Sequence, residues 1–338
     1  MNAPLVPLAT GFLNSVADFF SHLADVSPVP LLVGLAFFGT YLTIRARAYF
    51  NVLRAAYPAE PFQFRRIWGA YVAAYGFNNV VPARGGDVMK LFLVKSSVPH
   101  SSYPAVASSF AVETVFDLTI GIPVLAFAFT QGVFPKPPDF SDLGAFDLAY
   151  LASHPQLTLF LLTALGFLVL LLFAVLSVRV KAFWARVRQG VTILFDRRRY
   201  FREVWLVQFG GWLCRCAAFW FLLEAFGVGG SVRNVLLVLG CNAVAAAVPF
   251  TPGGAGVQQA LLVKVFAGSA AAATVAAFSV GQQIAIGAFS FALGFGALVG
   301  VFGFRSFREV RVMGKADREA AERERRAAER EEAGAPVA

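Results

Sequence analysis

Six charged residues stand inside or at the edge of apolar stretches that otherwise suit hydrocarbon. They are Arg84, Asp87, Lys90, Glu113, Asp117 and Arg215. A charged side chain at the centre of a bilayer costs roughly 2.5 to 3.5 kcal/mol on insertion scales, so we expect these side chains to face a shared protein interior. There they either pair with one another or bind a charged head group, and both alternatives stay open.

Two of the acidic residues, Glu113 and Asp117, are expected to have cationic partners. Glu113 and Asp117 are four residues apart, so they stack on one helical face, where two carboxylates repel unless a cation or a proton intervenes. Arg84 and Arg215 are the expected partners. Arg84 is also the strongest candidate for a phosphate contact, because a guanidinium binds phosphate with two parallel hydrogen bonds. We assign Arg84, Lys90 and Arg215 to phosphate, and the two acids to balancing or relaying charge.

Two similar Pro and Gly breaks interrupt the apolar sequence, at 78–87 and 248–256. Pro removes a backbone donor and Gly accepts strained dihedrals, so each break should end one helix and turn the chain back. In hydrocarbon such backbone survives only where it is buried in protein or lines a watery cavity. The residues that should form the breaks are Asn79, Pro82, Gly85, Gly86, Pro249 and Pro252. Further candidate substrate contacts are Asp87, Thr251, Gly253, Gly254, Gly256 and Gln258.

The amino-acid composition indicates a membrane protein. The 338 residues are 58% hydrophobic and 14% charged, whereas soluble domains are about one quarter charged. We therefore predict an all-α integral membrane protein. The net charge of +9 sits beside apolar segments, as topology signals do, so we expect no nucleic acid. Motifs for an ATP phosphate loop and for metal binding are missing, so we expect no cofactor, no metal and no direct use of ATP.

Five stretches are long enough to cross a hydrocarbon core of roughly 30 Å. They are about 29–50, 103–130, 157–178, 204–226 and 271–302. The broken elements occupy about 62–98 and 231–268, and their second limbs are too short to cross. Residues 1–27 have the apolar spacing of an interfacial amphipathic helix. Residues 28–303 form the transmembrane domain, and 304–338 form a charged cytoplasmic tail.

Loop charge orients these segments. The stretch 45–66 has five basic residues and 179–202 has eight, so both should be cytoplasmic, as should the tail. The first broken element then enters and leaves from the cytoplasm, and the second from outside. This predicts a polytopic bundle with two opposed re-entrant hairpins in inverted halves, about 28–130 and 204–302, joined by a span at 157–178. Two ordinary kinked crossings are the alternative.

Three motifs carry a family resemblance. Pro82, Arg84, Gly86 and Asp87 match Pro-x-Arg-x-Gly-Glu, with Asp for Glu. Glu113 and Asp117 match Glu-Arg-x-x-Asp, with Thr114 in place of Arg. The second break matches Pro-x-x-Pro-Gly-Gly-x-Gly and is followed by Gln258 and Gln259 where the family has an acid. From about 29 to 302 the chain thus resembles the transmembrane region of lysylphosphatidylglycerol synthases, a flippase-like family of prokaryotic membrane proteins.

The resemblance implies movement of a lipid head group between leaflets of the plasma membrane, in some members an aminoacylated phospholipid. No folded aminoacyl-transferase domain fits after Phe304, so we expect a transporter and not an enzyme. A separately encoded enzyme that modifies the lipid is a candidate partner, and the oligomeric state stays open. The alternatives are a glycosyltransferase that uses a polyprenyl-phosphate sugar, with Asp139, Asp142 or Asp147 as acid or base, and a carrier of small solutes.

The predicted topology can be tested with single cysteines in a background without native cysteines. Cysteines at Ser141 and Gly229 should react with an impermeant thiol reagent from outside. Cysteines at Gln189 and Ala320 should react only after permeabilisation. Labelling of a cysteine at Ser101 from outside would contradict the first re-entrant hairpin and, with it, the inverted repeat.

Overall fold

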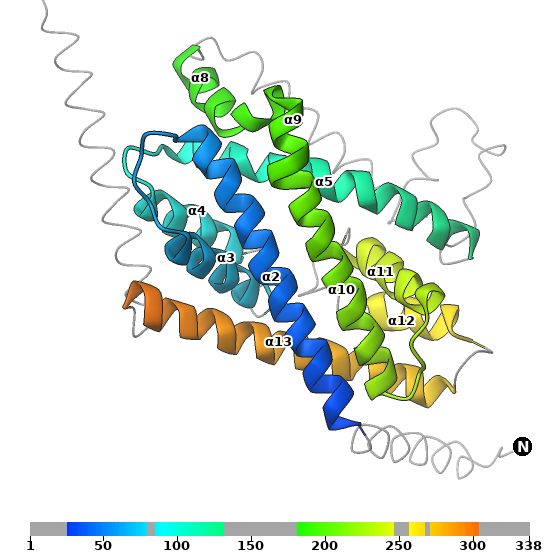
Figure 1. Cartoon of the computed structure of the whole chain (residues 1–338). Coiled ribbons are helices and arrows are strands. Elements are labelled where there is room, and N and C mark those ends of the chain that lie inside the picture. The colour runs from blue at the N-terminus through cyan, green and yellow to red at the C-terminus, as the bar shows by residue number, and fades with distance from the viewer. Residues whose placement is uncertain (1–25, 80–84, 132–180, 247–256, 268–270, 304–338) are drawn as a thin grey trace, which may run out of the picture.

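The computed structural model describes residues 26–79, 85–131, 181–246, 257–267 and 271–303. Within them every regular element is a helix, which confirms the all-α prediction (Figure 1). Four helices are long and apolar enough to cross a membrane: Pro28–Ala56, Tyr103–Thr130, Arg197–Ala225 and Ala272–Phe302. The N-terminal amphipathic helix, the span at 157–178 and the tail at 304–338 lie outside the described residues.

Local sequence explains where the long helices begin and end. Helix α2 (Pro28–Ala56) and helix α5 (Tyr103–Thr130) both have a proline in the first turn, where no backbone donor is needed. The Ser102 side chain also caps α5 by accepting from the Ala105 amide at 3.4 Å. Helix α13 (Ala272–Phe302) ends at Gly303, whose φ of 71° is the left-handed conformation that glycine adopts most easily.

The two broken elements are helix pairs with bounds close to those predicted. Helices α3 (Phe64–Asn78) and α4 (Gly85–Ser97) flank the first break, and α11 (Val232–Ala246) and α12 (Val257–Val265) flank the second. At 13 and 9 residues, α4 and α12 rise only about 20 and 14 Å as helix, far less than a hydrocarbon core. The short second limbs are therefore confirmed, while their re-entrant path stays a prediction.

Three antiparallel helix pairs join the two halves of the chain. Helix α2 runs beside α10 (Leu206–Ala225), since the Ser27 amide donates to the Ala225 carbonyl at 3.0 Å at one end and Asn51 donates to the Glu203 carbonyl at 2.7 Å at the other. Helix α3 packs along α13 and α11 along α5. In each of these pairs the first residues of the shorter helix contact the last residues of the longer one: an Arg65 nitrogen lies 2.8 Å from the Gly300 carbonyl, and an Arg233 nitrogen lies 3.1 Å from the Gln131 side chain.

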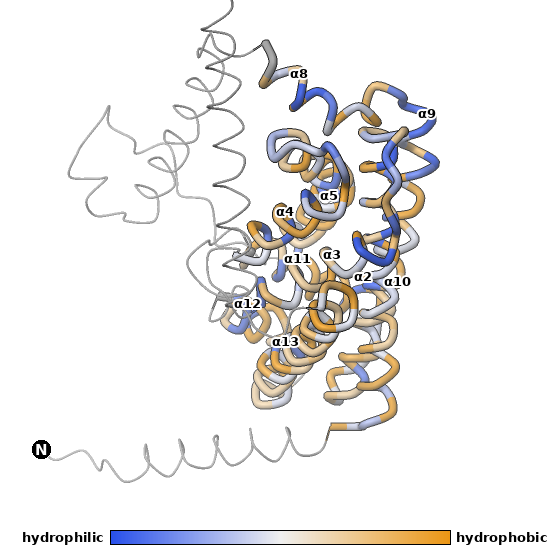
Figure 2. Tube along the Cα trace, turned by 90° about the vertical axis from the view of Figure 1, so that its left-hand side faces the viewer, coloured by the Kyte–Doolittle hydropathy of each residue, from blue (hydrophilic) through white to orange (hydrophobic). Residues whose placement is uncertain are grey.

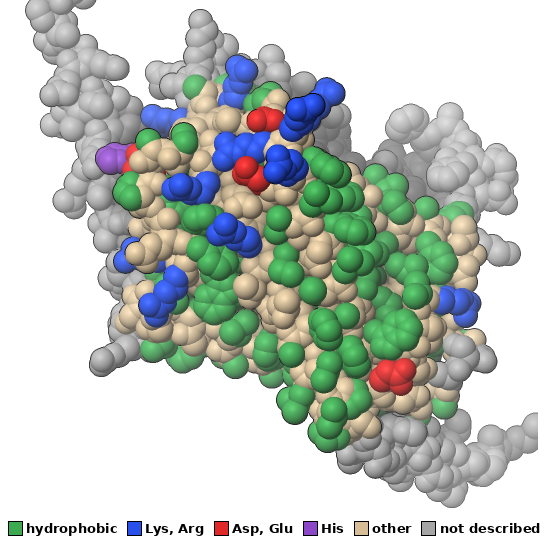
Figure 3. Space-filling model, viewed as in Figure 1, with side chains coloured by type: hydrophobic (Ala, Val, Ile, Leu, Met, Phe, Trp, Pro, Cys, Tyr) green, Lys and Arg blue, Asp and Glu red, His purple; other side chains and the backbone are tan. Residues whose placement is uncertain are grey.

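The basic stretches gather at one end of the molecule. Helix α8 (Lys181–Gly190) packs against α5, and Gln189 donates to the Ala56 carbonyl at the end of α2 at 3.1 Å. Figure 2 shows α8 and α9 (Arg197–Tyr200) as the hydrophilic end, and Figure 3 shows Lys and Arg side chains clustered there. Helix α10 exposes Leu206, Leu213 and Trp220, as expected of a surface that faces lipid. The grouping agrees with one cytoplasmic side, although sidedness itself stays a prediction.

The close approach of α3 to α13 predicts a sharp glycine requirement. A β-carbon on Gly76 would overlap the Ser290 carbonyl of α13, whereas a β-carbon on Gly287 of the same helix would meet nothing within 4 Å. Gly76→Ala should therefore lower the free energy of unfolding by about 1–3 kcal/mol, a typical cost of overpacking. Gly287→Ala, the matched control, should melt at or slightly above the wild-type temperature. Thermal unfolding in detergent measures both, and equal melting temperatures would contradict this packing.

Candidate functional site

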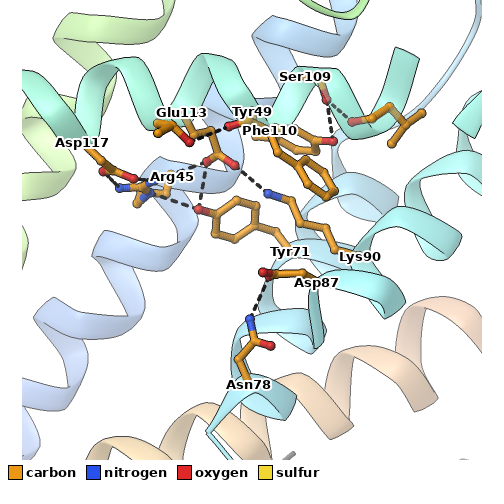
Figure 4. A network of polar contacts seen from close by, with 12 residues as sticks. Arg45, Tyr49, Tyr71, Asn78, Asp87, Lys90, Ser109, Phe110, Glu113 and Asp117 are labelled. Carbon is orange, nitrogen blue, oxygen red and sulfur yellow. Dashed lines mark hydrogen bonds and ion pairs between the residues drawn. The ribbon is translucent and has the colours of Figure 1, made fainter. Parts of the chain in front are cut away.

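The deepest charges in the described structure form an ion pair between α4 and α5. The Lys90 ammonium lies 2.6 Å from a Glu113 carboxylate oxygen, and the two side chains are only 9% and 8% exposed (Figure 4). The sequence analysis placed both residues in a shared interior, and the structure confirms this for the pair. The Lys90 ammonium is ion-paired with Glu113 in this structure. To contact a phosphate, Lys90 would have to leave that carboxylate.

Arg45 of α2 completes the cluster. Its guanidinium makes two bonds with the Asp117 carboxylate, at 2.6 and 3.0 Å, and lies 3.6 Å from Glu113. Arg45 was predicted as one of the loop charges, and this prediction was wrong: Arg45 lies within α2 with 9% of the residue exposed. Two cations and two carboxylates therefore neutralise one another between α2, α4 and α5.

Two tyrosines hold the charged groups in place. The Tyr71 hydroxyl of α3 accepts from Arg45 Nε at 3.0 Å and donates to Glu113 at 2.9 Å, so it bridges the cation and the acid. The Tyr49 hydroxyl of α2 lies 2.9 Å from the Ser109 hydroxyl, which donates to the Val106 carbonyl. Both rings are buried. Because each hydroxyl has a partner, burial of these polar atoms is not penalised by a missing hydrogen bond.

The cluster is closed on one side and open on the other. The side chains of Arg45, Lys90 and Glu113 are 11%, 9% and 8% exposed, while that of Asp117 is 51% exposed. A buried charge interacts more strongly with its partner than a hydrated one, because water screens the latter. Asp117 is thus the residue of the cluster that is accessible from outside the protein interior.

An asparagine ties the first break together. The Asn78 side chain at the end of α3 accepts from the Gly86 amide at 2.8 Å and donates to Asp87 at 2.8 Å. It caps the free amide at the start of α4 and orients the nearest acid. A β-carbon on Gly86 would overlap the Ala74 carbonyl, so this close crossing requires glycine. Asn79, predicted to form part of the first break, donates to the Tyr75 carbonyl of its own helix at 3.1 Å.

Arg215 of α10 does not pair with the acids of α5, contrary to expectation. Among the described residues, no carboxylate lies within ion-pair distance of it. Its guanidinium instead lies 5.7 Å from the Tyr41 ring and 5.8 Å from the Phe219 ring, and its buried Nε has no hydrogen-bond partner there. Its assignment to a phosphate contact stays a prediction.

Eight of the residues predicted to form the breaks or to contact substrate there fall outside the described part of the chain. These are Pro82, Arg84, Pro249, Thr251, Pro252, Gly253, Gly254 and Gly256. Gly85 begins α4, and Gln258 is buried in the first turn of α12. Beside it, Gln259 donates to Gln283 of α13 at 2.8 Å and so joins the two helices.

Comparison with known protein families identifies the family of this chain. The family described as the lysylphosphatidylglycerol synthase TM region matches residues 6–294. The chain belongs to this family. No curated protein and no solved structure matches it. Membership and the four apolar helices together establish a multi-pass membrane protein of the flippase-like kind.

Arg45 and the tyrosines are the residues that sequence reasoning missed in this family member. Arg45 stands within the predicted span 29–50, with Tyr41 and Tyr49 four residues to either side. Residues four apart share a helical face. An arginine between two aromatic residues on one face of a span was therefore the available signal that this charge faces protein and not the cytoplasm.

The different burial of the two acids predicts unequal effects on stability. Glu113→Gln leaves Lys90 without its carboxylate in a closed site, which should lower the free energy of unfolding by about 3–5 kcal/mol. Asp117→Asn, an equally conservative change, should lower it by about 1 kcal/mol or less, because half of that side chain lies outside the protein interior and Arg45 keeps Glu113 at 3.6 Å. Melting temperatures in detergent compare the two directly. A larger loss for Asp117→Asn would show that the cluster is organised around Arg45 instead.

Proposed function

We propose that this protein moves a lipid with a phosphate-bearing head group between the leaflets of a prokaryotic plasma membrane, without direct use of ATP. The observation that carries the proposal is a neutral cluster in a membrane bundle beside a broken helix. Arg45, Lys90 and Glu113 of this cluster are buried, and Asp117 is half-exposed. A lipid head group cannot cross hydrocarbon unaided, and a row of compensated charges is a polar route through it.

The cost of this cluster argues that it does more than join helices. Buried ion pairs contribute little net stability, and apolar residues of similar volume often stabilise a core as well or better. Ionisable residues within membrane segments are rare and commonly mark the paths of ions, protons or substrates. Four of them meet here, together with two hydrogen-bonded tyrosines, which favours a substrate path over simple helix pairing.

The arrangement of helices supports an inverted repeat as the scaffold. In this repeat, α2, α3, α4 and α5 of the first half would correspond to α10, α11, α12 and α13 of the second half. The contacts between helices agree with this correspondence. The contact of α2 with α3 corresponds to that of α10 with α11, the contact of α3 with α4 to that of α11 with α12, and the contact of α3 with α13 to that of α11 with α5. Helices α2 and α10 are antiparallel, as inverted halves require. In such transporters the substrate site lies between the repeats, at the broken helices.

Within this scheme the cationic residues at and near the breaks would hold the phosphate. Arg84 follows Pro82 directly before α4, and Arg215 is a guanidinium without a described carboxylate partner. The glycines of the second break would form the opposing gate. Glu113 and Asp117 would balance the charge of the head group as it passes.

Reconstitution with labelled phospholipids tests the function. Wild-type protein in liposomes should expose an inner-leaflet fluorescent lipid to an impermeant quencher faster than protein-free liposomes do. Arg45→Lys keeps the charge but loses the two-bond contact with Asp117, so the rate should fall about tenfold, the equivalent of one charge-assisted hydrogen bond.

The matched control is Arg199→Lys. Arg199 pairs with Glu203 at 3.0 Å on the surface, where the two side chains are 39% and 42% exposed. The Arg199→Lys variant should therefore translocate the lipid at the wild-type rate. Size-exclusion chromatography establishes that both variants are folded. A wild-type rate no higher than that of protein-free liposomes, for every phospholipid tried, would refute the proposed function.

A further inference from the structure

The ammonium of Lys90 sits in a cage of three aromatic rings. Its nitrogen lies 3.9 Å from the centroid of Tyr49, 4.3 Å from that of Tyr71 and 4.5 Å from that of Phe110. The Glu113 carboxylate closes the remaining side at 2.6 Å (Figure 4). Aromatic faces attract cations electrostatically, and several such faces around one carboxylate are typical of sites that bind alkylammonium groups.

The cage is built without the helix that fills it. Tyr49 comes from α2, Tyr71 from α3, and Phe110 and Glu113 from α5, whereas Lys90 comes from α4. Hydrogen bonds to Ser109 and Arg45 hold the hydroxyls of Tyr49 and Tyr71, so neither ring depends on Lys90 for its position. The cage is therefore preorganised for a cation, whichever molecule supplies it.

We propose that this cage is a binding site for a primary alkylammonium group, that Lys90 is its internal occupant, and that the free amine of a translocated lipid takes the place of Lys90. The proposal rests on the proposed function for its lipid, but not for the cage itself. It adds the recognition of an amine to a transport site otherwise argued from phosphate.

The exchange conserves charge. One ammonium enters as another leaves, so Glu113 is never left unpaired in the closed interior. Lys90 has a second anion within reach, because Asp87 lies three residues earlier on the same helix and is bonded to the neutral amide of Asn78. The half-exposed Asp117, one turn from Glu113, offers an incoming amine its first carboxylate. A lysine side chain, with its flexible stem, suits such an exchange.

The cage can be tested by removing its occupant. Lys90→Ala should melt below the wild type, and n-butylammonium chloride should raise its melting temperature in a saturable way, since only the folded cage binds the probe. Potassium chloride at equal ionic strength and n-butanol at equal concentration should not do so. Lys90→Met, which fills the cage with an apolar chain, and Lys90→Ala combined with Glu113→Gln should both be insensitive to butylammonium.

Two results would overturn the cage. One is a butylammonium response that is equal in all variants, and the other is no response in folded Lys90→Ala. If Lys90→Ala yields no folded protein, Lys90→Ser takes its place and is purified with and without butylammonium. A higher yield of monodisperse protein with butylammonium would support the cage, and an equal yield would overturn it.

A second experiment uses the unaltered protein and separates this inference from the proposed function. Two fluorescent phospholipids that differ only in a free or an acetylated head-group amine are compared in liposomes. The free amine should be translocated about tenfold faster, as the loss of one desolvated cation contact implies. Equal and protein-dependent rates would overturn the role of the cage in transport while the proposed function stood. Movement of neither lipid would count against the proposed function, and the butylammonium result would still decide the cage.

Discussion

The rest of the structure depends on the requirement that no charge be left uncompensated in the interior of the bundle. Lys90 of α4 and Arg45 of α2 each reach a carboxylate of α5, so one ion-paired cluster joins three helices of the first half of the chain. A buried carboxylate that loses its cation strongly destabilises the protein. The helices must therefore be placed so that each cation reaches its carboxylate. The rotation and height of α5 relative to α2 and α4 are set by this requirement.

The first helix break makes this geometry attainable. Helix α4 can present Lys90 to α5 only if the chain turns back directly after α3, and it does so where Gly86 passes against the Ala74 carbonyl. Asn78 then caps the free amide and binds Asp87, so the backbone polar groups that the break exposes regain partners. The break and the ion pair therefore support each other.

The same features connect stability to the proposed transport. A polar interior that neutralises itself is tolerated in an apolar bundle. In the proposed transport, its ion pairs would be exchanged for those of a head group with little change in net charge. The aromatic rings around Lys90 add selectivity for the kind of cation, because their contribution depends on close contact with an ammonium. In the proposed inverted repeat, the two halves would supply the opposing surfaces between which such an exchange takes place.

The sequence by itself determined the membrane, the long helices, the two breaks and the family, because hydropathy, Pro and Gly act through local chemistry that the order of residues records directly. It also placed Lys90 and Glu113 in an interior. Only the tertiary structure decided that Arg45, and not Arg215, pairs with the acids of α5, and that Tyr49, Tyr71 and Phe110 surround Lys90. These contacts join residues on separate helices, and which faces meet depends on how the helices are rotated and offset against one another. Periodicity within a single helix carries no information about that offset.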